Sequence, residues 1–428
     1  MGTDGYPARV RALSDRLVAA QRGIRILDAI KWDDGIRQAF FAAGCRELPP
    51  VDRGYYQRSA LGCDAAAVRE ALRGLQADVA SQLGRVNPAG QLMSRMCDEY
   101  LLVLEMLEAR GTPGFGRAAR QLYGSASDAF HAGGPTVADL ADSLDEALRG
   151  IDESSFLEEV TRDIPVARAV ELLQRRLDQV FDDEGFRVRV TVSDGILADA
   201  AAGSDYIKLR TDALFSERDL RVLEAHEGWV HVGTTLNGQS QPWCTFLSKG
   251  TPSTTITQEG LALLVEILAG TSHPARLRRV TDRVHAIAAA EAGASFVEVF
   301  GMLRERGRSE EQAYATSVRV FRGSTPDGGP FTKDLAYHKG FVQLYNFLQV
   351  AVRRGRLDRI PLLFCGKLTL EDVGTLSDLV SQRLVVPPRY LPPPLVDLNG
   401  LVAFLAFASF LNRVDLVQVE ADYARLLA

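Results

Sequence analysis

The strongest constraint on how this chain can fold is the spacing of two histidines on one predicted helix. His226 and His231 lie five residues apart, and Glu227 directly follows the first of them. In a regular α-helix, residues five apart point about 140° away from each other, so the two imidazoles would not converge. A local π-bulge accommodates one additional residue and is common at functional sites. A π-bulge here could bring the two imidazoles together, and Gly228 inside the motif would ease the distortion.

Flanking residues predict where this helix begins and ends. Ser216 can cap an N-terminus with Asp219 at the third helical position, which predicts a helix that begins near Glu217. Asn237 and Gly238 supply the left-handed conformation that often follows a last helical turn, so we expect the helix to end there.

Short strands precede this helix, and most of the remaining chain has helical periodicity. Apolar and polar residues alternate over residues 186–192 and over Tyr206–Arg210, as they do in half-buried strands. The rest of the chain mostly repeats its apolar residues at helical spacing. The predicted fold class is α+β and mainly helical, with a small sheet beside the histidine-bearing helix.

Charge and cysteine content exclude several classes of partner. The 428 residues carry 49 Lys and Arg against 55 Asp and Glu, a formal net charge of -6. The chain lacks the basic excess that binding to a phosphate backbone requires, so we expect no nucleic acid partner. The five cysteines form no closely spaced pair, which is typical of free thiols in a reducing compartment, and we expect a cytoplasmic protein.

The most apolar stretch is too short to cross a membrane. Leu401–Leu411 has about half of the roughly 20 residues that a membrane-spanning helix needs, and Arg413 and Asp415 follow it closely. The N-terminal residues lack the apolar core of a secretory signal. We therefore expect no membrane partner and interpret Leu401–Leu411 as a buried helix.

The two histidines are candidate ligands of a metal ion. A catalytic zinc needs three protein ligands and an open position for water, and two histidines with one glutamate form an established set. Glu259 opens a further predicted helix, which we expect to begin at Thr257 or Gln258. If the two helices pack antiparallel, Glu259 can face both imidazoles. The predicted metal ligands are therefore His226, His231 and Glu259.

Other residues near these segments have alternative interpretations. Glu266 lies about two helical turns beyond Glu259 on the same face, either as a second-choice ligand or as the acceptor of a histidine N–H. Cys244 lies between the two segments, but a thiolate would make a different zinc set, so we interpret it as a buried thiol. Two histidines with a carboxylate also suit iron.

Glu227 is the predicted catalytic base. Beside the first ligand, it would take a proton from a metal-bound water and pass it to the leaving amine, which implies peptide hydrolysis. The competing interpretation places both histidines on an exposed or core helix with no metal, and the downstream Glu259 favours the metal site.

The motifs in this part of the chain resemble those of a known family. HEGWVH and TQEGLALL, the strand YIKLR before them, and FRG and GGPFTKDLAYHKG after them are similar to motifs of the bacterial QEGLA-motif proteins, named for flavohaemoglobin expression modulation. The microtubule-associated tyrosine carboxypeptidases are relatives of those proteins. The similarity spans roughly residues 206–340, and this chain has Trp229-Val230 where Gly-Thr is commoner.

The resemblance implies a zincin-like metallopeptidase fold, a zinc cofactor and removal of a C-terminal aromatic residue, which is tyrosine from tubulin in the characterised relatives. Residue by residue, it implies the ligands His226, His231 and Glu259 and the catalytic carboxylate Glu227. Tubulin itself is not implied for a chain of bacterial type. We expect three regions: helical N-terminal residues 1–150, a zincin-like catalytic domain at residues 151–355, and helical C-terminal residues 356–428.

A carboxypeptidase also needs basic groups that bind the free carboxylate of its substrate, and Arg and Lys supply them. Lys208 and Arg210 share one face of the strand Tyr206–Arg210. Both are candidates if this is an edge strand beside the substrate, and a solvated strand face is the alternative.

Further candidates flank a Gly/Pro loop in the segment that carries the resemblance. Arg322 and Lys333 are candidates for substrate binding, and Tyr337, or else His338, for donating a hydrogen bond to the developing oxyanion. Lys333 could instead pair with a nearby carboxylate, and Tyr337 could lie in the core.

Three functions compete on these observations. The favoured one is a zinc-dependent carboxypeptidase acting on the C-terminal tail of a peptide or protein, with an aromatic last residue. The second is a regulatory or scaffold protein that a metal stabilises without turnover, and the third is an endopeptidase or amidase with an open groove. The first is favoured over the scaffold because a scaffold has no physical need for a general base beside the first ligand.

Overall fold

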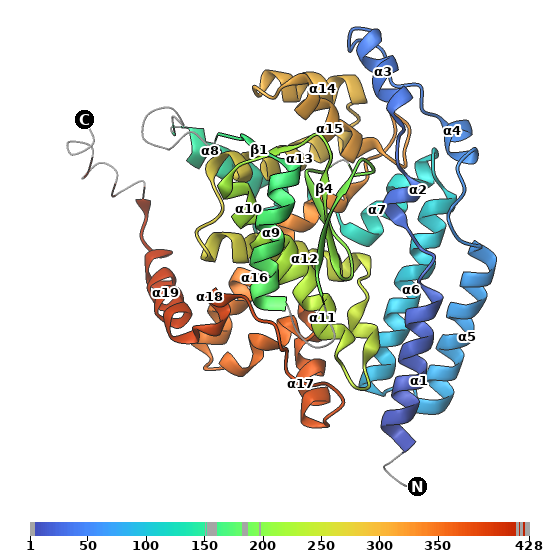
Figure 1. Cartoon of the computed structure of the whole chain (residues 1–428), viewed down its shortest axis with the longest axis vertical. Coiled ribbons are helices and arrows are strands. Elements are labelled where there is room, and N and C mark those ends of the chain that lie inside the picture. Colours follow the sequence, from blue (N-terminus) through green and yellow to red (C-terminus); the bar gives the residue numbers. More distant parts are fainter. Residues whose placement is uncertain are drawn as a thin grey trace.

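A computed structural model describes residues 5–149, 151, 161–181, 187–196, 198–416, 419 and 423, and its architecture is α+β and mainly helical, as predicted (Figure 1). The N-terminal helices are α1 (Gly5–Ala20), α2 (Ile26–Ala29), α3 (Asp34–Ala42), α4 (Arg53–Gln57), α5 (Ala65–Leu83), α6 (Pro88–Glu108), α7 (Pro113–Tyr123) and α8 (Val137–Arg149). The central elements are β1 (Ile164–Pro165), α9 (Val166–Phe181), β2 (Arg189–Ser193), β3 (Ala200–Ala202), β4 (Tyr206–Arg210), β5 (Leu214–Phe215), α10 (Glu217–Leu223), η1 (Glu224–Val232), α11 (Gly233–Gln239), η2 (Thr245–Ser248) and α12 (Pro252–Leu268).

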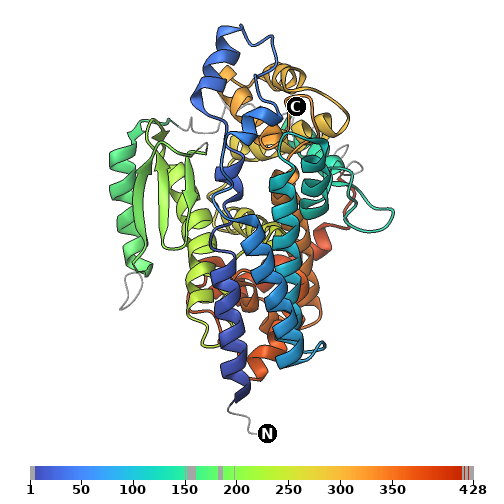
Figure 2. The same ribbon diagram turned by 90° about the vertical axis from the view of Figure 1, so that its right-hand side faces the viewer.

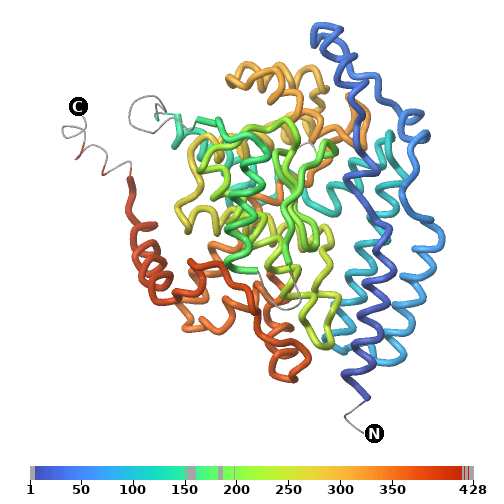
Figure 3. Tube along the Cα trace, viewed as in Figure 1, coloured from blue at the N-terminus to red at the C-terminus, as the bar shows by residue number. Residues whose placement is uncertain are grey.

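The remaining elements are helical as well. They are α13 (Pro274–Glu291), α14 (Phe296–Glu305), α15 (Glu310–Phe321), η3 (Thr332–Leu335), α16 (Ala336–Arg353), η4 (Leu357–Arg359), η5 (Pro361–Phe364), η6 (Leu370–Asp372), α17 (Val373–Ser381), α18 (Pro393–Val396) and α19 (Leu398–Leu411). Figure 3 shows the N-terminal helices, in blue, along one flank and the C-terminal residues, in red, on the opposite side.

The largest core joins the N-terminal helices to the centre of the molecule. Leu13 of α1, Leu72 of α5 and Met93 of α6 are buried in one apolar cluster with Leu261 of α12 and Leu344 of α16. Burial of such side chains is the main favourable contribution to folding. All five cysteines are free thiols, as predicted, and the thiol of Cys244 is buried in this same cluster.

A three-stranded sheet lies beside the histidine-bearing helix, as the alternation predicts. β2 pairs with β4 in parallel, with Val190 opposite Ile207, and β3 pairs with β4 antiparallel, with Ala200 opposite Leu209. Ile207 and Leu209 are buried in one cluster with Leu177 of α9. Figure 2 shows α9 and this sheet together on one side of the N-terminal helices. Residue 186, the first of the predicted first strand, lies outside the described residues.

The prediction that Tyr206–Arg210 forms an edge strand is wrong. β4 is the central strand of its sheet, and β3 forms the edge that contacts η1. β3 consists of Ala200–Ala202, three alanines without any alternation of apolar and polar residues. The period-two pattern that identifies half-buried strands is absent from such a segment, which explains why it was not predicted.

One predicted helix start is confirmed and the other is wrong. α10 begins where predicted, and Ser216 and Asp219 form the expected reciprocal capping box. α12 begins at Pro252, before the predicted Thr257 or Gln258. The proline occupies the first helical turn, where its missing N–H has no helical partner to lose, and this start signal was overlooked.

The predicted helix end near Asn237 and Gly238 is confirmed to within one residue, since α11 ends at Gln239, but the predicted left-handed conformation is absent. The Asn237 amide is buried and donates to the backbone carbonyls of Phe364 and Tyr390, at 2.8 Å each. Gly238 lies in the helix where a Cβ would collide with the backbone of the segment after α11. Both residues therefore serve tertiary contacts instead of a helix cap.

The apolar segment near the C-terminus is helical, as predicted, but only partly buried. Leu401 and Leu405 of α19 are buried, whereas Phe404, Phe407 and Phe410 are exposed. The interpretation as a buried helix is therefore wrong for one face of α19, which lies at the periphery in Figure 1. Within the described part of the chain, no helix is both long and apolar enough to cross a membrane.

Two glycines allow the helices α12 and α16 to make backbone contact at the centre of the fold. A Cβ on Gly260 of α12 would collide with the backbone of Gly340 in α16, and a Cβ on Gly340 would collide with the carbonyl group of Ile256. Because backbone atoms cannot move aside as a side chain can, only glycine fits at either position. This contact fixes the position of α12 beside η1 and α16.

We expect Gly260→Ala to destabilise the protein by at least about 1–3 kcal/mol, because the added methyl group overpacks a backbone contact. Urea unfolding of the full chain measures this change. Gly301→Ala is the matched control, since Gly301 lies in α14 with no atom within 4 Å of an added Cβ. That control should be neutral or stabilising by up to about 1 kcal/mol. Equal stabilities of the two variants would contradict the proposed packing constraint.

Candidate metal centre and the adjoining cavity

The π-bulge that could bring the two histidines together is present as a π-helical segment. η1 is continuous with α10 before it and α11 after it. Because π-helical hydrogen bonds join residues five apart, His226 and His231 lie one turn apart on the same side of the helix. Their ring centroids are 4.8 Å apart. Gly228 lies against Leu177 of α9, where an added Cβ would come within 2.7 Å of a leucine methyl group, so this packing favours glycine.

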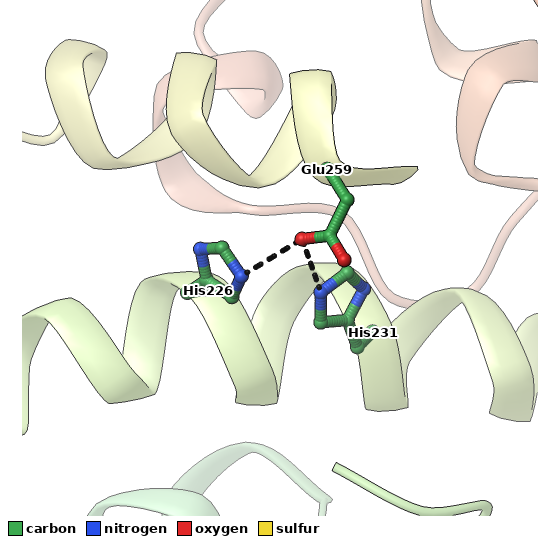
Figure 4. Close-up of side chains that lie close together, drawn as sticks. All are labelled: His226, His231 and Glu259. Atoms are coloured by element: carbon green, nitrogen blue, oxygen red, sulfur yellow. Dashed lines mark ion pairs between the residues drawn. The ribbon is translucent and has the colours of Figure 1, made fainter. Parts of the chain in front are cut away.

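Glu259 of α12 faces both imidazoles, as Figure 4 shows. Its Oε2 atom lies 3.4 Å from His226 Nε2 and 3.5 Å from His231 Nε2. The candidate ligand atoms of the three residues all lie within 4.8 Å of one another. Among the described residues, this is the one group of His, Cys, Asp and Glu side chains that is close enough to hold a metal ion.

The donor atoms of this group suit a divalent metal ion. Glu259 Oε2 is buried and has no hydrogen-bond partner of good geometry in the described part of the chain. A buried carboxylate oxygen is unfavourable without a partner. A cation between this oxygen and the two imidazole nitrogens would satisfy all three atoms, and two histidines with one carboxylate form a known set for such an ion.

An acceptor on the far side orients each histidine. His226 Nδ1 donates to Glu266 Oε1 at 2.6 Å, and Arg276 donates to the same oxygen at 3.0 Å. His231 Nδ1 lies 3.4 Å from Gln258 Oε1. With Nδ1 used in this way, Nε2 of each ring is left for a metal. Two roles were considered for Glu266, a second-choice metal ligand or the acceptor of a histidine N–H. The structure shows the second of them.

Buried charges hold the Glu259 carboxylate ionised. Burial raises the pKa of Glu259, but the Lys333 ammonium and the two histidines outweigh burial and hold this pKa well below its usual range. Lys333 Nζ lies 3.1 Å from Glu259 Oε1. Burial lowers the pKa of His226, but the neighbouring carboxylates of Glu259 and Glu266 outweigh burial and raise that pKa well above its usual value. Lys333 thus pairs with a carboxylate, the alternative considered for it.

A cavity of about 370 Å³ adjoins His226, which lines it together with Glu227, whereas His231 and Glu259 do not line it. Glu227 Oε2 accepts a hydrogen bond of 2.9 Å from the backbone N–H of Ala202 in the edge strand β3. The volume falls in the usual range for a small-ligand pocket. Glu227 is therefore oriented beside His226 at a space that can hold part of another molecule.

The structure brings two of the predicted substrate-contacting residues to this cavity. Tyr337 lines it and stacks on His226, with ring centroids 6.2 Å apart. Arg210 lines it as well, paired with Asp199 and Asp212 at 3.0 and 2.7 Å.

The other predicted substrate-contacting residues lie elsewhere. The Lys208 ammonium lies over the ring of Tyr206, and the buried Arg322 guanidinium lies over the ring of Phe331. Lys208, Arg322, Lys333 and His338 do not line the cavity.

Two polar residues that adjoin the histidines were missed in the sequence. Gln258 Oε1 accepts from the Thr234 hydroxyl at 2.8 Å and from Lys367 Nζ at 3.1 Å. Lys367 also donates to the backbone carbonyl of His231 at 3.3 Å, and burial lowers its pKa to about 8. Gln258 could have been found because it directly precedes Glu259. Lys367 lies in no motif, and only the tertiary fold brings it here.

A row of arginines along the cavity was missed as well. Arg276, Arg279 and Arg283 follow the helical spacing i, i+3, i+7 on α13, and all three line the cavity. Arg319 of α15 lines the same wall. The spacing of the first three could have been read from the sequence as one helix face.

This protein has a mainly helical α+β fold with a candidate metal centre beside a cavity, and these features define its class. Comparison with known proteins identifies its family. The chain belongs to the family described as microtubule-associated tyrosine carboxypeptidase, whose family model matches residues 38–413. This match confirms the resemblance to that family and extends it from α3 into α19. A search of curated proteins found no match.

Asp334 holds two of the cavity arginines in place. Its carboxylate accepts from Arg319 at 2.6 and 2.8 Å, and Arg283 lies 3.8 Å away. Burial raises the pKa of Asp334, but Arg319 and Arg283 outweigh burial and hold this pKa well below the usual value of 3.8.

We expect Asp334→Asn to lower the free energy of unfolding by about 3–5 kcal/mol at neutral pH, because it leaves two buried guanidinium groups without their carboxylate. A carboxylate with a lowered pKa stabilises the fold above its unfolded pKa and loses that effect as the pH falls toward its folded pKa. The difference between wild type and variant should therefore persist from pH 7 to about pH 4 and shrink below it.

Urea unfolding at several pH values measures this difference. The exposed Asp327 provides the control, and Asp327→Asn should change stability by no more than about 0.5 kcal/mol. Equal effects of the two substitutions would contradict the ion-pair interpretation.

Proposed function

We propose that the chain is a zinc-dependent carboxypeptidase, with a zincin-like catalytic domain at residues 151–355, that removes the last residue of a peptide or protein tail. The observation that carries this proposal is the convergence of His226, His231 and Glu259 beside the cavity that Glu227 lines. The family description supports the reaction type and makes tyrosine the first terminal residue to test.

Zinc at this position would lower the pKa of a bound water to near neutrality and polarise the carbonyl group of the substrate. Glu227 is the general base: it accepts a proton from the attacking water and returns it to the amine nitrogen as the C–N bond breaks. The Ala202 N–H orients the carboxylate through Oε2. Tyr337, on the same cavity, is the proposed donor to the oxyanion that develops on the carbonyl oxygen.

The roles proposed for other residues follow from their positions. Arg210 is retained as a substrate-binding residue because it lines the cavity. Lys333 is proposed to orient the Glu259 carboxylate and balance part of its charge, because Lys333 Nζ donates to Oε1 and leaves Oε2 for the metal. We do not retain Lys208 or Arg322 as substrate-binding residues.

Metal content tests the first part of the proposal. We expect about one zinc per chain in purified wild-type protein, and loss of zinc in His231→Ala and Glu259→Ala, because each removes one of three ligands. Elemental analysis measures this. His285→Ala is the control and should keep its zinc, since His285 pairs with Asp145 instead. Wild-type protein without metal, even after zinc is supplied, would refute the metal site.

Turnover tests the second part. Glu227→Gln should retain its zinc but lose at least about 100-fold in kcat, because the amide cannot accept the proton. Release of the terminal amino acid from a peptide ending in tyrosine measures the rate. Glu224→Gln is a matched control on the same π-helix and should keep its activity, because Glu224 pairs with Arg176 away from the cavity.

The outcomes also separate the proposal from its alternatives. A protein that holds zinc but cleaves no peptide would support the metal-stabilised regulatory or scaffold protein. Cleavage that persists when the peptide carries a C-terminal amide would support an endopeptidase or amidase instead.

A further inference from the structure

Lys367 is held beside the candidate ligand His231 and contacts its surroundings at two points. Its Nζ atom donates to the backbone carbonyl of His231 at 3.3 Å and to Gln258 Oε1 at 3.1 Å. The backbone N–H of Lys367 donates to the carbonyl of Leu247 at 2.6 Å, and its side chain passes Gly250, where an added Cβ would come within 3.2 Å of Lys367 Cδ. These contacts fix the place of the ammonium group.

The Gln258 amide can present either of its ends to His231. Turning the amide by 180° exchanges Oε1 and Nε2 with little change in shape, so the neighbouring groups decide which atom faces the imidazole. Oε1 lies 3.4 Å from His231 Nδ1, and Nε2 is buried with no hydrogen-bond partner in the described part of the chain. In the turned amide, Nε2 would donate to His231 Nδ1 instead.

The direction of this contact decides which ring nitrogen of His231 can bind a metal. A neutral imidazole has one N–H and one lone pair. With Oε1 of Gln258 facing Nδ1, the proton is on Nδ1, and the lone pair is on Nε2, which lies 3.5 Å from Glu259 Oε2. With the amide turned, the proton would be on Nε2, and His231 would offer no donor atom to a metal beside Glu259.

Of the three groups that contact Gln258 Oε1 among the described residues, Lys367 distinguishes the two orientations. The Thr234 hydroxyl, 2.8 Å away, suits either, because it donates and accepts, and the carbonyl of Val230 at 2.6 Å can take its proton. His231 suits either by carrying its proton on the other nitrogen. An ammonium group has three donors and no acceptor, so Lys367 requires the oxygen. Without it, the turned amide would satisfy the otherwise unpartnered Nε2.

We propose that Lys367 is a positioning residue of the metal centre: it holds the Gln258 amide with its oxygen towards His231 and so directs the Nε2 lone pair of His231 to the metal. The inference rests on the proposed function, because it presupposes the zinc site at His226, His231 and Glu259. Lys367 does not line the cavity, so it acts through Gln258 and not on the substrate.

The sign of a change in zinc affinity tests this role. A nearby positive charge repels a cation, so loss of Lys367 would tighten zinc binding if charge alone mattered. We expect the opposite: Lys367→Met should raise the Kd for zinc about tenfold or more, because loss of an outer hydrogen-bond partner typically weakens metal binding by about 10- to 100-fold. Competition with a chelator near neutral pH measures this Kd on the full chain. An unchanged or lower Kd would overturn the inference.

A second substitution separates the orientation of the amide from a merely structural effect. Both oxygens of a carboxylate accept, so Gln258→Glu supplies an acceptor to His231 in either orientation and needs no lysine to choose between them. In the Gln258→Glu chain, we therefore expect Lys367→Met to change the Kd for zinc by about threefold or less. An equal loss with Gln258 and with Gln258→Glu would indicate a structural role and overturn the inference.

Lys339→Met is the matched control for the loss of a lysine. Lys339 pairs with Asp128 at 3.0 Å and does not line the cavity. This variant should keep the zinc affinity of the wild type. A loss as large as that of Lys367→Met would show that the effect does not come from Gln258, and the inference would fail.

The ring protons of His231 provide a test that needs no variant of Lys367. In the zinc-loaded wild type, we expect a proton on Nδ1 and zinc on Nε2 of this ring. Nitrogen-15 NMR of the chain labelled at histidine measures this, and the signals of its six histidines can be assigned by substitution. Zinc on Nδ1 of His231 would overturn the inference even if Lys367→Met does not fold.

These outcomes are distinct from those that test the proposed function, because none of them needs peptide turnover. A chain that binds zinc but cleaves no peptide would still support the role of Lys367 if Lys367→Met weakens zinc binding and Gln258→Glu removes that effect. A zinc-binding chain in which Lys367→Met leaves the Kd unchanged would overturn this inference alone. A wild-type chain that binds no zinc would refute the metal site and the inference together.

Discussion

The centre of this protein depends on one turn of π-helix. If η1 were regular α-helix, His226 and His231 would point in directions about 140° apart, and Glu259 could face only one of them. The distortion is supported from both sides: Gly228 lies against α9, and the backbone of β3 donates to Glu227. A π-helical turn is less favourable than an α-helical one, so its persistence here reflects the packing around it.

Around that turn, each buried carboxylate has at least one buried cation beside it. Glu259 faces Lys333, and Glu266 faces Arg276. A buried charge is tolerated when it is paired and hydrogen-bonded. These pairs therefore explain how the three candidate ligands can lie in the interior of the folded protein.

The sequence was sufficient for the features that depend on local spacing. The separation of His226 and His231 indicates a π-turn if the two histidines share a metal, and Ser216 with Asp219 marks the start of the helix before it. The fold class follows from periodicity in the same way. The predictions that were wrong concern residues whose neighbours come from distant parts of the chain.

Asn237 and Lys208 illustrate the two kinds of failure. The helix does end close to Asn237, but Asn237 does not take the left-handed conformation that was expected of it, and its amide instead binds carbonyl groups more than a hundred residues away in the sequence. Lys208 lies on a strand that only the unpredicted pairing with β3 makes central. Lys367 carries no local signal at all, since only the fold brings it to Gln258.

Three consecutive residues of α12 have three different tasks. Gln258 lies against His231 Nδ1, Glu259 faces both histidines, and Gly260 meets the backbone of α16. A single inserted or deleted residue in the first turns of α12 would rotate these side chains by about 100° around the helix axis. The orientation of His231, the third donor and the helix contact would then all be lost together. The register of α12 is therefore the property that holds the centre together, and length variation in this family should be found in loops and not between Pro252 and Gly260.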